Sequence, residues 1–374
     1  RALHELAYSY YADSNFTESK KYAELGLKLF PNKSNQWYLI LANDEDELGN
    51  TQKALDYYDK IIAVNPNSYL NWFNKGITYY KAKNFTEAKK CLQRSALIYP
   101  YHPSTHYYLG VISFEEGKPV QALMSFCANL FSNPENKYLG KSIGYISSIA
   151  DAKDDLMKYV NAAKKEKQDD FESVQEILLS KAALSKSYKS KSSLEDGIVK
   201  QIQVMMEKLE FNADDKGFWM QYYVPFYKAS FTDKGFEPFS YYLFSGINTK
   251  QVKDYVKRNQ KAIDNVLTPA ITYFNNLKET QVLNVAEREK VKARYFFNNG
   301  YVYGKGVWEP AGKELKLTGS WEFYYNNGAV RSKGNFNGNG DKEGVWEYYY
   351  ENGQLKEKLS YKNGLVNGKG YSWF

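Results

Sequence analysis

The sequence contains few of the side chains that carry out chemistry. Only three histidines and two cysteines occur among its 374 residues. Sequences of the types G-x-S-x-G and H-E-x-x-H, and the Walker phosphate-binding sequence, do not occur. General acid–base or nucleophilic catalysis needs several convergent groups, so the sequence predicts a protein that is not an enzyme. An enzyme with a site in the middle of the chain is the weakest of three hypotheses.

No metal or other cofactor is expected. His102 and His106 are four residues apart, a spacing that could suit a metal, but no cysteine or acidic residue lies within a helical turn of them. We therefore expect His106 to pack in a core. Cys91 and Cys127 are interpreted as small buried hydrophobic residues, and two cysteines leave the redox compartment open.

The chain has a small excess of positive charge and no long apolar run. Its formal net charge is +7, from 50 lysines and arginines against 43 acids. The nearest basic cluster is Lys181, Lys186, Lys189 and Lys191, with Tyr188 as its one interleaved aromatic residue. This is not the charge pattern of a nucleic-acid-binding surface, so no nucleic acid is expected as a partner. No apolar run approaches the ~18–20 residues needed to cross a bilayer.

Proline is also scarce, with ten residues in the chain, but four of them are evenly placed. Pro31, Pro66, Pro100 and Pro134 are 35, 34 and 34 residues apart. The segment between two of these prolines is long enough for two helices. Each proline is expected to end the second helix, because proline cannot continue a helix. A period of this length is typical of stacked helix pairs, which form extended surfaces that hold other molecules.

Three full repeats, which begin at Asn35, Tyr69 and Pro103, share further positions. Small residues at the eighth and twentieth positions let the two helices of a pair approach closely, and a large residue at the twenty-fourth fills the gap. In repeat order these residues are Ala42, Gly76 and Gly110, then Ala54, Ala88 and Ala122, then Tyr58, Leu92 and Phe126. Gly76 is expected to face Ala88, and Thr17 and Thr86 are expected to cap the second helices of their pairs.

With Trp72, Gly76 and Tyr79 in one unit, this pattern resembles the tetratricopeptide repeat (TPR). The resemblance implies an α-solenoid over residues 1–135, in which the first helix of each pair lines a groove. The groove positions taken as a partner-binding site are Leu39, Asn43, Leu70, Phe73, Ile77, Tyr80, Tyr107, Val111 and Phe114. The groove is aromatic and lacks the cations that grip a terminal carboxylate, so an apolar segment is the expected occupant. Ordinary packing between repeats remains an equal alternative for these aromatic residues.

A second repeat occurs near the other end of the sequence. The run from Gly319 through Trp321 to Gly328 recurs 25 residues later, from Gly344 through Trp346 to Gly353. Each run ends in Asn-Gly, a strong signal for a tight β-hairpin turn. The pattern resembles the bacterial variant of MORN repeats, which implies a single-layer ribbon of antiparallel hairpins over residues 295–374. The match is looser at Trp308, where Pro310 is expected to interrupt the strand.

Alternation along one of these runs places Trp346, Tyr348 and Tyr350 on one face of the ribbon. Internal stacking accounts for most of these rings. The family has been linked to lipid binding, dimerisation and scaffolding, and some bacterial members carry an antitoxin label. None of these roles transfers to a particular residue, so the resemblance favours a structural role.

Residues 136–294 form the third predicted region, which is helical and rich in aromatic residues. It contains a Ser/Lys-rich stretch over 185–193 that is interpreted as a solvated loop. The aromatic residues of 217–246 are expected to pack the helical array onto the ribbon, and a partner-binding surface is the alternative. The predicted fold class is therefore α+β, with a helical solenoid, a helical middle region and a C-terminal ribbon.

The leading functional hypothesis is a non-enzymatic scaffold that binds one or more proteins in a multi-subunit complex. The combination of the two repeats resembles proteins of Bacteroidota, in which such chains are often envelope components. The expected location is therefore the periplasm, in association with the outer membrane, as an accessory subunit of an assembly or secretion complex. Arg1 opens the sequence in mid-pattern, so a missing upstream anchor or a partner is expected to provide any membrane association. The alternative is a cytoplasmic, antitoxin-like regulatory protein.

Overall fold

The computed structural model describes residues 2–31, 34–64, 68–163, 171–194, 196–285, 288–296, 302–311, 314–325 and 329–373. Helices precede a single antiparallel sheet along the chain, which confirms the predicted α+β class. The chain divides into two compact units. Unit 1 combines residues 1–99 with 276–374, and unit 2 comprises residues 100–275. This division differs from the predicted boundaries at 135 and 294, because the fourth helix pair packs with the helices that follow it.

The helices of unit 1 form three antiparallel pairs. They are α1 (Ala2–Ala12), α2 (Phe16–Leu29), α3 (Ser34–Glu47), α4 (Thr51–Val64), α5 (Tyr69–Lys81) and α6 (Phe85–Ile98). The second helices of the first and third pairs begin one residue before the threonines that were expected to cap them, so their N-caps stand two residues before those threonines. Asn15 and Asn84 are the caps, and their side chains accept hydrogen bonds from the backbone N–H groups of Glu18 and Glu87 at 3.3 Å. Asparagine competes well with threonine at this position because its carbonyl oxygen reaches the third N–H group.

The repeat frame is visible in the close approach of paired helices. A Cβ atom at Gly76 would lie 3.0 Å from Cγ of Leu92, so position eight faces position twenty-four rather than Ala88 at position twenty. In the repeat that begins at Asn35, the residues at positions eight and twenty-four, Ala42 and Tyr58, likewise belong to one buried cluster. Pro66, one of the four periodic prolines, lies outside the described residues.

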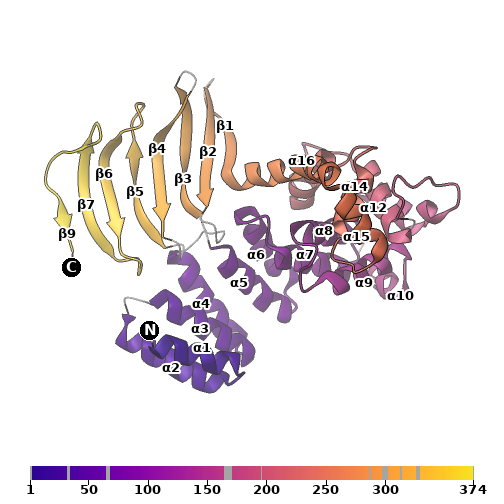
Figure 1. Cartoon of the computed structure of the whole chain (residues 1–374). Helices are drawn as coiled ribbons and strands as arrows, with labels where there is room; N and C mark the ends of the chain where they lie inside the picture. The colour runs from indigo at the N-terminus through magenta and orange to yellow at the C-terminus, as the bar shows by residue number, and fades with distance from the viewer. Residues whose placement is uncertain are drawn as a thin grey trace. The chain divides into compact units, whose positions relative to one another are not determined.

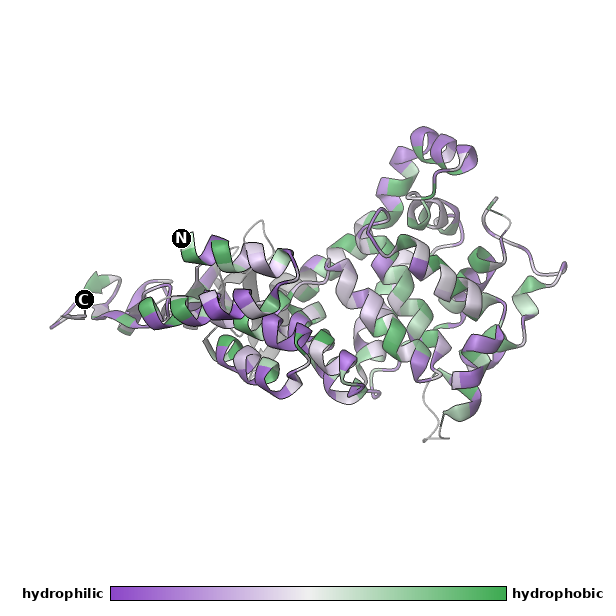
Figure 2. Cartoon of the chain, turned by 90° about the horizontal axis from the view of Figure 1, so that it is seen from below, coloured by the Kyte–Doolittle hydropathy of each residue, from purple (hydrophilic) through white to green (hydrophobic). Residues whose placement is uncertain are grey.

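Unit 2 begins with the fourth helix pair of the periodic pattern. Its helices are α7 (Pro103–Glu115), α8 (Pro119–Ser132), α9 (Leu139–Ala150), α10 (Asp154–Ala162), α11 (Glu172–Leu179), α12 (Gly197–Lys208), α13 (Val224–Ser230), α14 (Phe236–Leu243), α15 (Lys250–Arg258) and α16 (Gln260–Glu279), whose last residues belong to unit 1. A 3-10 helix, Ala182–Leu184, and a π-helix, Trp219–Tyr223, complete it. Hydrophobic residues concentrate on the central helices of this unit in Figure 2.

The core of unit 2 forms around α8, which is buried along almost its whole length. The aromatic residues of 217–246 supply much of this core rather than a surface. Tyr222, Tyr223, Phe226, Tyr227, Phe236, Phe239 and Tyr241 are each at most 2% exposed. The π-helix ends two residues before Pro225, whose ring cannot follow a regular α-helical turn, so the backbone widens there.

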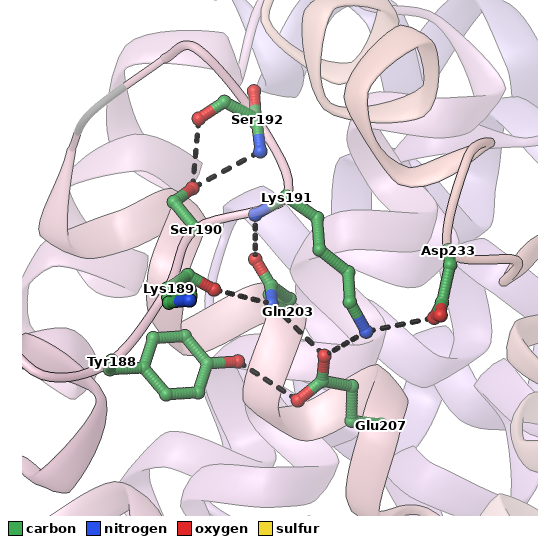
Figure 3. Close-up of polar contacts among 8 residues, drawn as sticks. All are labelled: Tyr188, Lys189, Ser190, Lys191, Ser192, Gln203, Glu207 and Asp233. Carbon is green, nitrogen blue, oxygen red and sulfur yellow. Dashed lines mark hydrogen bonds and ion pairs between the residues drawn. The ribbon is translucent and has the colours of Figure 1, made fainter.

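The Ser/Lys-rich segment over 185–193 is anchored to the rest of unit 2 (Figure 3). The Lys191 ammonium pairs with Glu207 on α12 and, at 2.8 Å, with Asp233. The Tyr188 hydroxyl donates to the other oxygen of Glu207 at 2.9 Å, and the Lys191 backbone N–H donates to Gln203 at 2.8 Å. Lys191 is therefore compensated by two carboxylates and adds little to a basic patch.

The sheet belongs to unit 1, and its strands β1 to β8 follow one another in space as they do in sequence. They are β1 (Thr280–Val285), β2 (Arg288–Phe296), β3 (Val302–Ala311), β4 (Glu314–Tyr324), β5 (Val330–Phe336), β6 (Lys342–Tyr349), β7 (Leu355–Lys362), β8 (Leu365–Val366) and β9 (Tyr371–Ser372), which pairs with β7. Figure 1 shows the strands side by side, and Figure 2 shows the sheet edge-on as one layer.

The sheet departs from the sequence prediction at two places. It starts at Thr280, before the predicted boundary at residue 295. Strand β3 also continues through Pro310, which was expected to interrupt it. The ladder between β2 and β3 extends only to Trp308, so at Pro310 the strand pairs with β4 alone and the missing N–H costs no ladder bond on the β2 side.

Candidate interaction surfaces

The predicted groove residues fall in both units. Leu39 packs against the buried cluster of Ala42, Ala54 and Tyr58, and the Asn43 side chain accepts a hydrogen bond from the Tyr58 hydroxyl at 2.6 Å. Both side chains therefore contribute to contacts within their own repeat. On α5, Leu70, Phe73, Ile77 and Tyr80 are half-buried.

The groove positions in unit 2 lie in its interior. Tyr107 is 6% exposed, and Val111 and Phe114 are each 2% exposed. The Tyr107 ring stacks on Tyr138 with their centroids 4.0 Å apart, and the Phe114 and Tyr145 rings form a T-shaped pair with their centroids 4.9 Å apart. Helix α9 therefore covers these positions, as a following helix would in a continued array. Whether the remaining groove residues bind a partner stays a prediction.

His106 is used within the core of unit 2. It is fully buried, Nδ1 lies 2.7 Å from the Tyr223 hydroxyl, and Nε2 lies 2.6 Å from the carbonyl oxygen of Pro100. Burial lowers the pKa of His106 to about 4, so the ring is neutral at pH 7. A neutral ring that donates through Nε2 and accepts through Nδ1 satisfies both contacts. Within the described residues, no group of three or more metal-ligating side chains occurs.

The ribbon repeats a tryptophan-on-glycine contact. The Trp321 indole lies over Gly306 and the Trp346 indole over Gly334, where a Cβ atom would come within 2.1 Å and 2.4 Å of the ring. Each indole N–H donates to a carbonyl oxygen of the covered strand, Val307 at 3.1 Å and Asn335 at 3.0 Å. Both tryptophans are at most 1% exposed, so this contact buries large rings in a sheet that has one layer.

One face of the ribbon carries a row of alternating charges, which we call the charged face. Its residues face one another across consecutive strands and are Lys305, Glu322, Lys333, Glu347 and Lys358. Ion pairs join Lys305 to Glu322 at 2.8 Å, Lys333 to Glu347 at 3.1 Å, and Lys358 to Glu347 at 3.2 Å. A hydrogen bond from Tyr349 and the two lysines hold the pKa of Glu347 at about 2.

The opposite face, which we call the aromatic face, carries Trp321, Phe323, Phe336, Trp346, Tyr348 and Tyr361. Phe336 meets Trp346 edge-on at 5.1 Å, and Phe323 stacks towards Trp346 at 6.2 Å. A hollow of about 470 Å³ lies among these rings, and Arg331, Lys342 and Lys356 also line it. This surface combines apolar area with positive charge and is a candidate binding site in unit 1.

The hairpin between β4 and β5 also contacts the helices of unit 1. Tyr324 is fully buried in a cluster with Tyr69 and Ile98, and Val330 packs against the same cluster. Leu70, one of the predicted groove residues, joins it. An apolar residue of the predicted groove is therefore used by this chain itself.

Sequence reasoning found the aromatic repeat but assigned binding to the helical groove. A sequence difference between the two ribbon repeats could have indicated the site on the aromatic face. Lys342 stands 25 positions after Leu317, so a cation replaces an apolar residue just where the aromatic rings gather. The Asn-Gly turn at 327–328 lies outside the described residues, whereas that at 352–353 forms a hairpin in which Gly353 has φ +83°.

Family comparisons match both repeats. The MORN repeat variant matches residues 317–337 and 342–363, and the tetratricopeptide repeat matches residues 38–68 and 69–102. No curated protein matches the sequence significantly.

Three solved structures are similar to parts of the chain. A crystal structure of MamA is 17% identical with a TM-score of 0.35, and the match covers 41% of this chain and 90% of MamA. A MamA RS-1 ArsTM double mutant is 14% identical with a TM-score of 0.34, covering 44% and 96%. A structure of Naa15/Naa10 bound to HypK-THB is 18% identical with a TM-score of 0.33, covering 73% of this chain and 39% of that one. The repeat matches therefore identify tetratricopeptide repeats over residues 38–102 and variant MORN repeats over residues 317–337 and 342–363.

Proposed function

We propose that this protein is a non-enzymatic scaffold that holds protein partners in a multi-subunit complex. The observation that carries the proposal is the hollow on the aromatic face, which presents apolar rings and cations but no convergent acid–base or nucleophilic group. Both repeat families are typical of interaction scaffolds. A surface of this kind is suited to binding rather than to catalysis, because aromatic residues and arginine commonly dominate interfaces.

The α5 residues of the predicted groove provide a second proposed contact surface. Phe73, Ile77 and Tyr80 follow one another at i, i+4 and i+7, so they share a helix face. Ile77→Glu places a charge in this apolar row and should release a partner that binds there. Thr86→Glu adds the same charge at an exposed position of α6 and is the matched control.

The test is affinity purification of the tagged chain from native cells, with the partners identified by mass spectrometry. We expect proteins in stoichiometric amounts, and loss of at least one of them with Ile77→Glu but not with Thr86→Glu. Purification of the chain alone at native expression levels would overturn the scaffold proposal. Equal recovery with both variants would remove α5 from it.

We further propose that the complex belongs to the bacterial envelope. Support comes from the resemblance of the repeat combination to envelope proteins. No helix in the described part of the chain has the length and apolar character to span a bilayer. Fractionation of cells that express the native gene tests the location. Recovery from the periplasm or outer membrane is expected, whereas recovery from the cytosol would favour the antitoxin-like alternative.

A further inference from the structure

The cations on the two faces of the ribbon differ in whether they form ion pairs. On the charged face, Lys305, Lys333 and Lys358 each pair with a glutamate. On the aromatic face, none of Arg331, Lys342 and Lys356 forms an ion pair with a described residue. Three cations and one acid, Glu357, line the hollow, which therefore carries an excess of positive charge.

Lys342 is held in place by rings rather than by a carboxylate. Its ammonium lies 4.4 Å from the centroid of Trp346, 5.3 Å from that of Tyr348 and 5.0 Å from that of Tyr361. It donates one hydrogen bond, to the Tyr348 hydroxyl at 2.9 Å. An ammonium has three N–H groups, so two remain to contact a ligand in the hollow.

The other two cations stand at equivalent positions of successive repeats. Arg331 and Lys356 are 25 residues apart, and each is the extra residue at a shift of strand register. Such bulges re-aim a side chain, and here both side chains line the hollow. The repeat thus places charge at regular intervals along the rim of an aromatic surface.

We infer that the aromatic face binds a segment of a protein partner in which acidic side chains flank an apolar anchor residue. The anchor occupies the hollow among Phe323, Phe336 and Tyr348. The flanking carboxylates pair with Lys342, Arg331 and Lys356, which have no acidic partner among the residues that the structure describes. This inference rests on the proposed scaffold function and names the chemistry of one partner.

The contacts around Trp346 favour a peptide over a single-stranded nucleic acid. A base needs an open ring face for stacking. The Lys342 ammonium lies over the Trp346 ring, and Phe336 contacts the same ring in a T-shaped arrangement.

The test is binding of a fluorescein-labelled peptide, Gly-Glu-Glu-Leu-Glu-Glu-Gly, to the full chain, measured by fluorescence anisotropy. We expect Lys342→Gln to weaken binding about tenfold, as the loss of a charge-assisted hydrogen bond does. Lys342→Arg should retain binding because it keeps the charge. Lys358→Gln is the matched control, since it removes the same charge from the opposite face, and it should change binding by less than about twofold.

Two further probes bind poorly if the inference is right: the same peptide with lysine for glutamate, and the same peptide with glycine for leucine. Equal binding by wild type and Lys342→Gln, with both folded by circular dichroism, would overturn the inference. Tight binding of oligothymidine or of phosphatidylglycerol vesicles in competition with the peptide would also overturn it. If native partners are captured but the wild-type chain does not bind the peptide, the proposed scaffold function is retained and the inference of an acidic partner segment is overturned.

Discussion

The Trp346 indole lies flat against Gly334 of the neighbouring strand, where a Cβ atom would come within 2.4 Å of the ring. Glycine is required there by space, because any side chain would displace an indole that also donates a hydrogen bond to Asn335. The same relationship joins Trp321 to Gly306. In each of these two repeats, the ribbon therefore buries a tryptophan ring by packing it on a glycine of the neighbouring strand.

Gly334→Ala is expected to destabilise the ribbon. The added methyl group overpacks the indole contact, which should cost about 1–3 kcal/mol in the free energy of unfolding. Chemical denaturation followed by tryptophan fluorescence measures the change. Gly338→Ala is the control, since nothing lies within 4 Å of a Cβ atom at that exposed turn position. Equal stability of the two variants would contradict the indole-on-glycine contact.

In unit 2, the repeat frame places a glycine, Gly110, against an aromatic ring, so a substitution there should also lower stability. A Cβ atom at Gly110 would lie 2.8 Å from the Phe126 ring, so Gly110→Ala should lower stability by about 1–3 kcal/mol. Gly144 on α9 has nothing within 4 Å, and Gly144→Ala should raise stability by about 0.5–1 kcal/mol through helix propensity. Thermal melts by circular dichroism compare the two. A rise in melting temperature for Gly110→Ala would show that the frame is misplaced.

Asp44 should make the stability of unit 1 depend on pH. It is fully buried, and its carboxylate oxygens have no hydrogen-bond partner among the described residues. Burial raises the pKa of Asp44 to about 7, so the folded state takes up a proton that the unfolded chain, with a pKa of about 3.9, releases. This contribution is favourable below pH ~4 and is lost as the pH rises through about 7.

Asp44→Asn should therefore stabilise the protein above pH 7 by about 1–3 kcal/mol and have a smaller effect at pH 4. Urea unfolding at several pH values measures the difference. Asp13→Asn makes the same substitution at an exposed position and is the matched control. A variant that is equally stabilised at both pH values would indicate that packing, rather than ionisation, sets the effect.

Glu347 should make stability depend on pH in the opposite direction, because its pKa is lowered rather than raised. Its pKa is held at about 2 by the Tyr349 hydroxyl and by Lys333 and Lys358, so its stabilisation is present above the unfolded value of about 4.3. It is lost as the pH falls through about 2. Glu347→Gln should lower stability by about 1 kcal/mol at pH 7, and the difference should disappear near pH 2. Urea titrations of the pair measure this, and a difference that persists in acid would exclude the ionic origin.

The helix pairs and the ribbon could be predicted from the sequence because each depends on contacts that recur at a fixed period. Gly110 meets Phe126 within one helix pair, and Trp346 lies over Gly334 on the adjacent strand of the ribbon. Such contacts are short-range along the chain, so their residue types repeat with the period. Thr17 and Thr86 were wrong as caps because the pattern cannot choose between two capping residues that stand two positions apart.

The face that each element presents was decided only by the tertiary structure. Tyr107, Val111 and Phe114 occupy groove positions by their spacing, yet α9 covers them although it lacks the 34-residue frame. The ion pairing of Glu347 with two lysines depends on strand register and on which face each side chain reaches. The same holds for Lys342, which has no acidic partner within the described part of the chain. Local periodicity determines which residues share a face, whereas what covers that face depends on distant parts of the chain that the periodic pattern does not include.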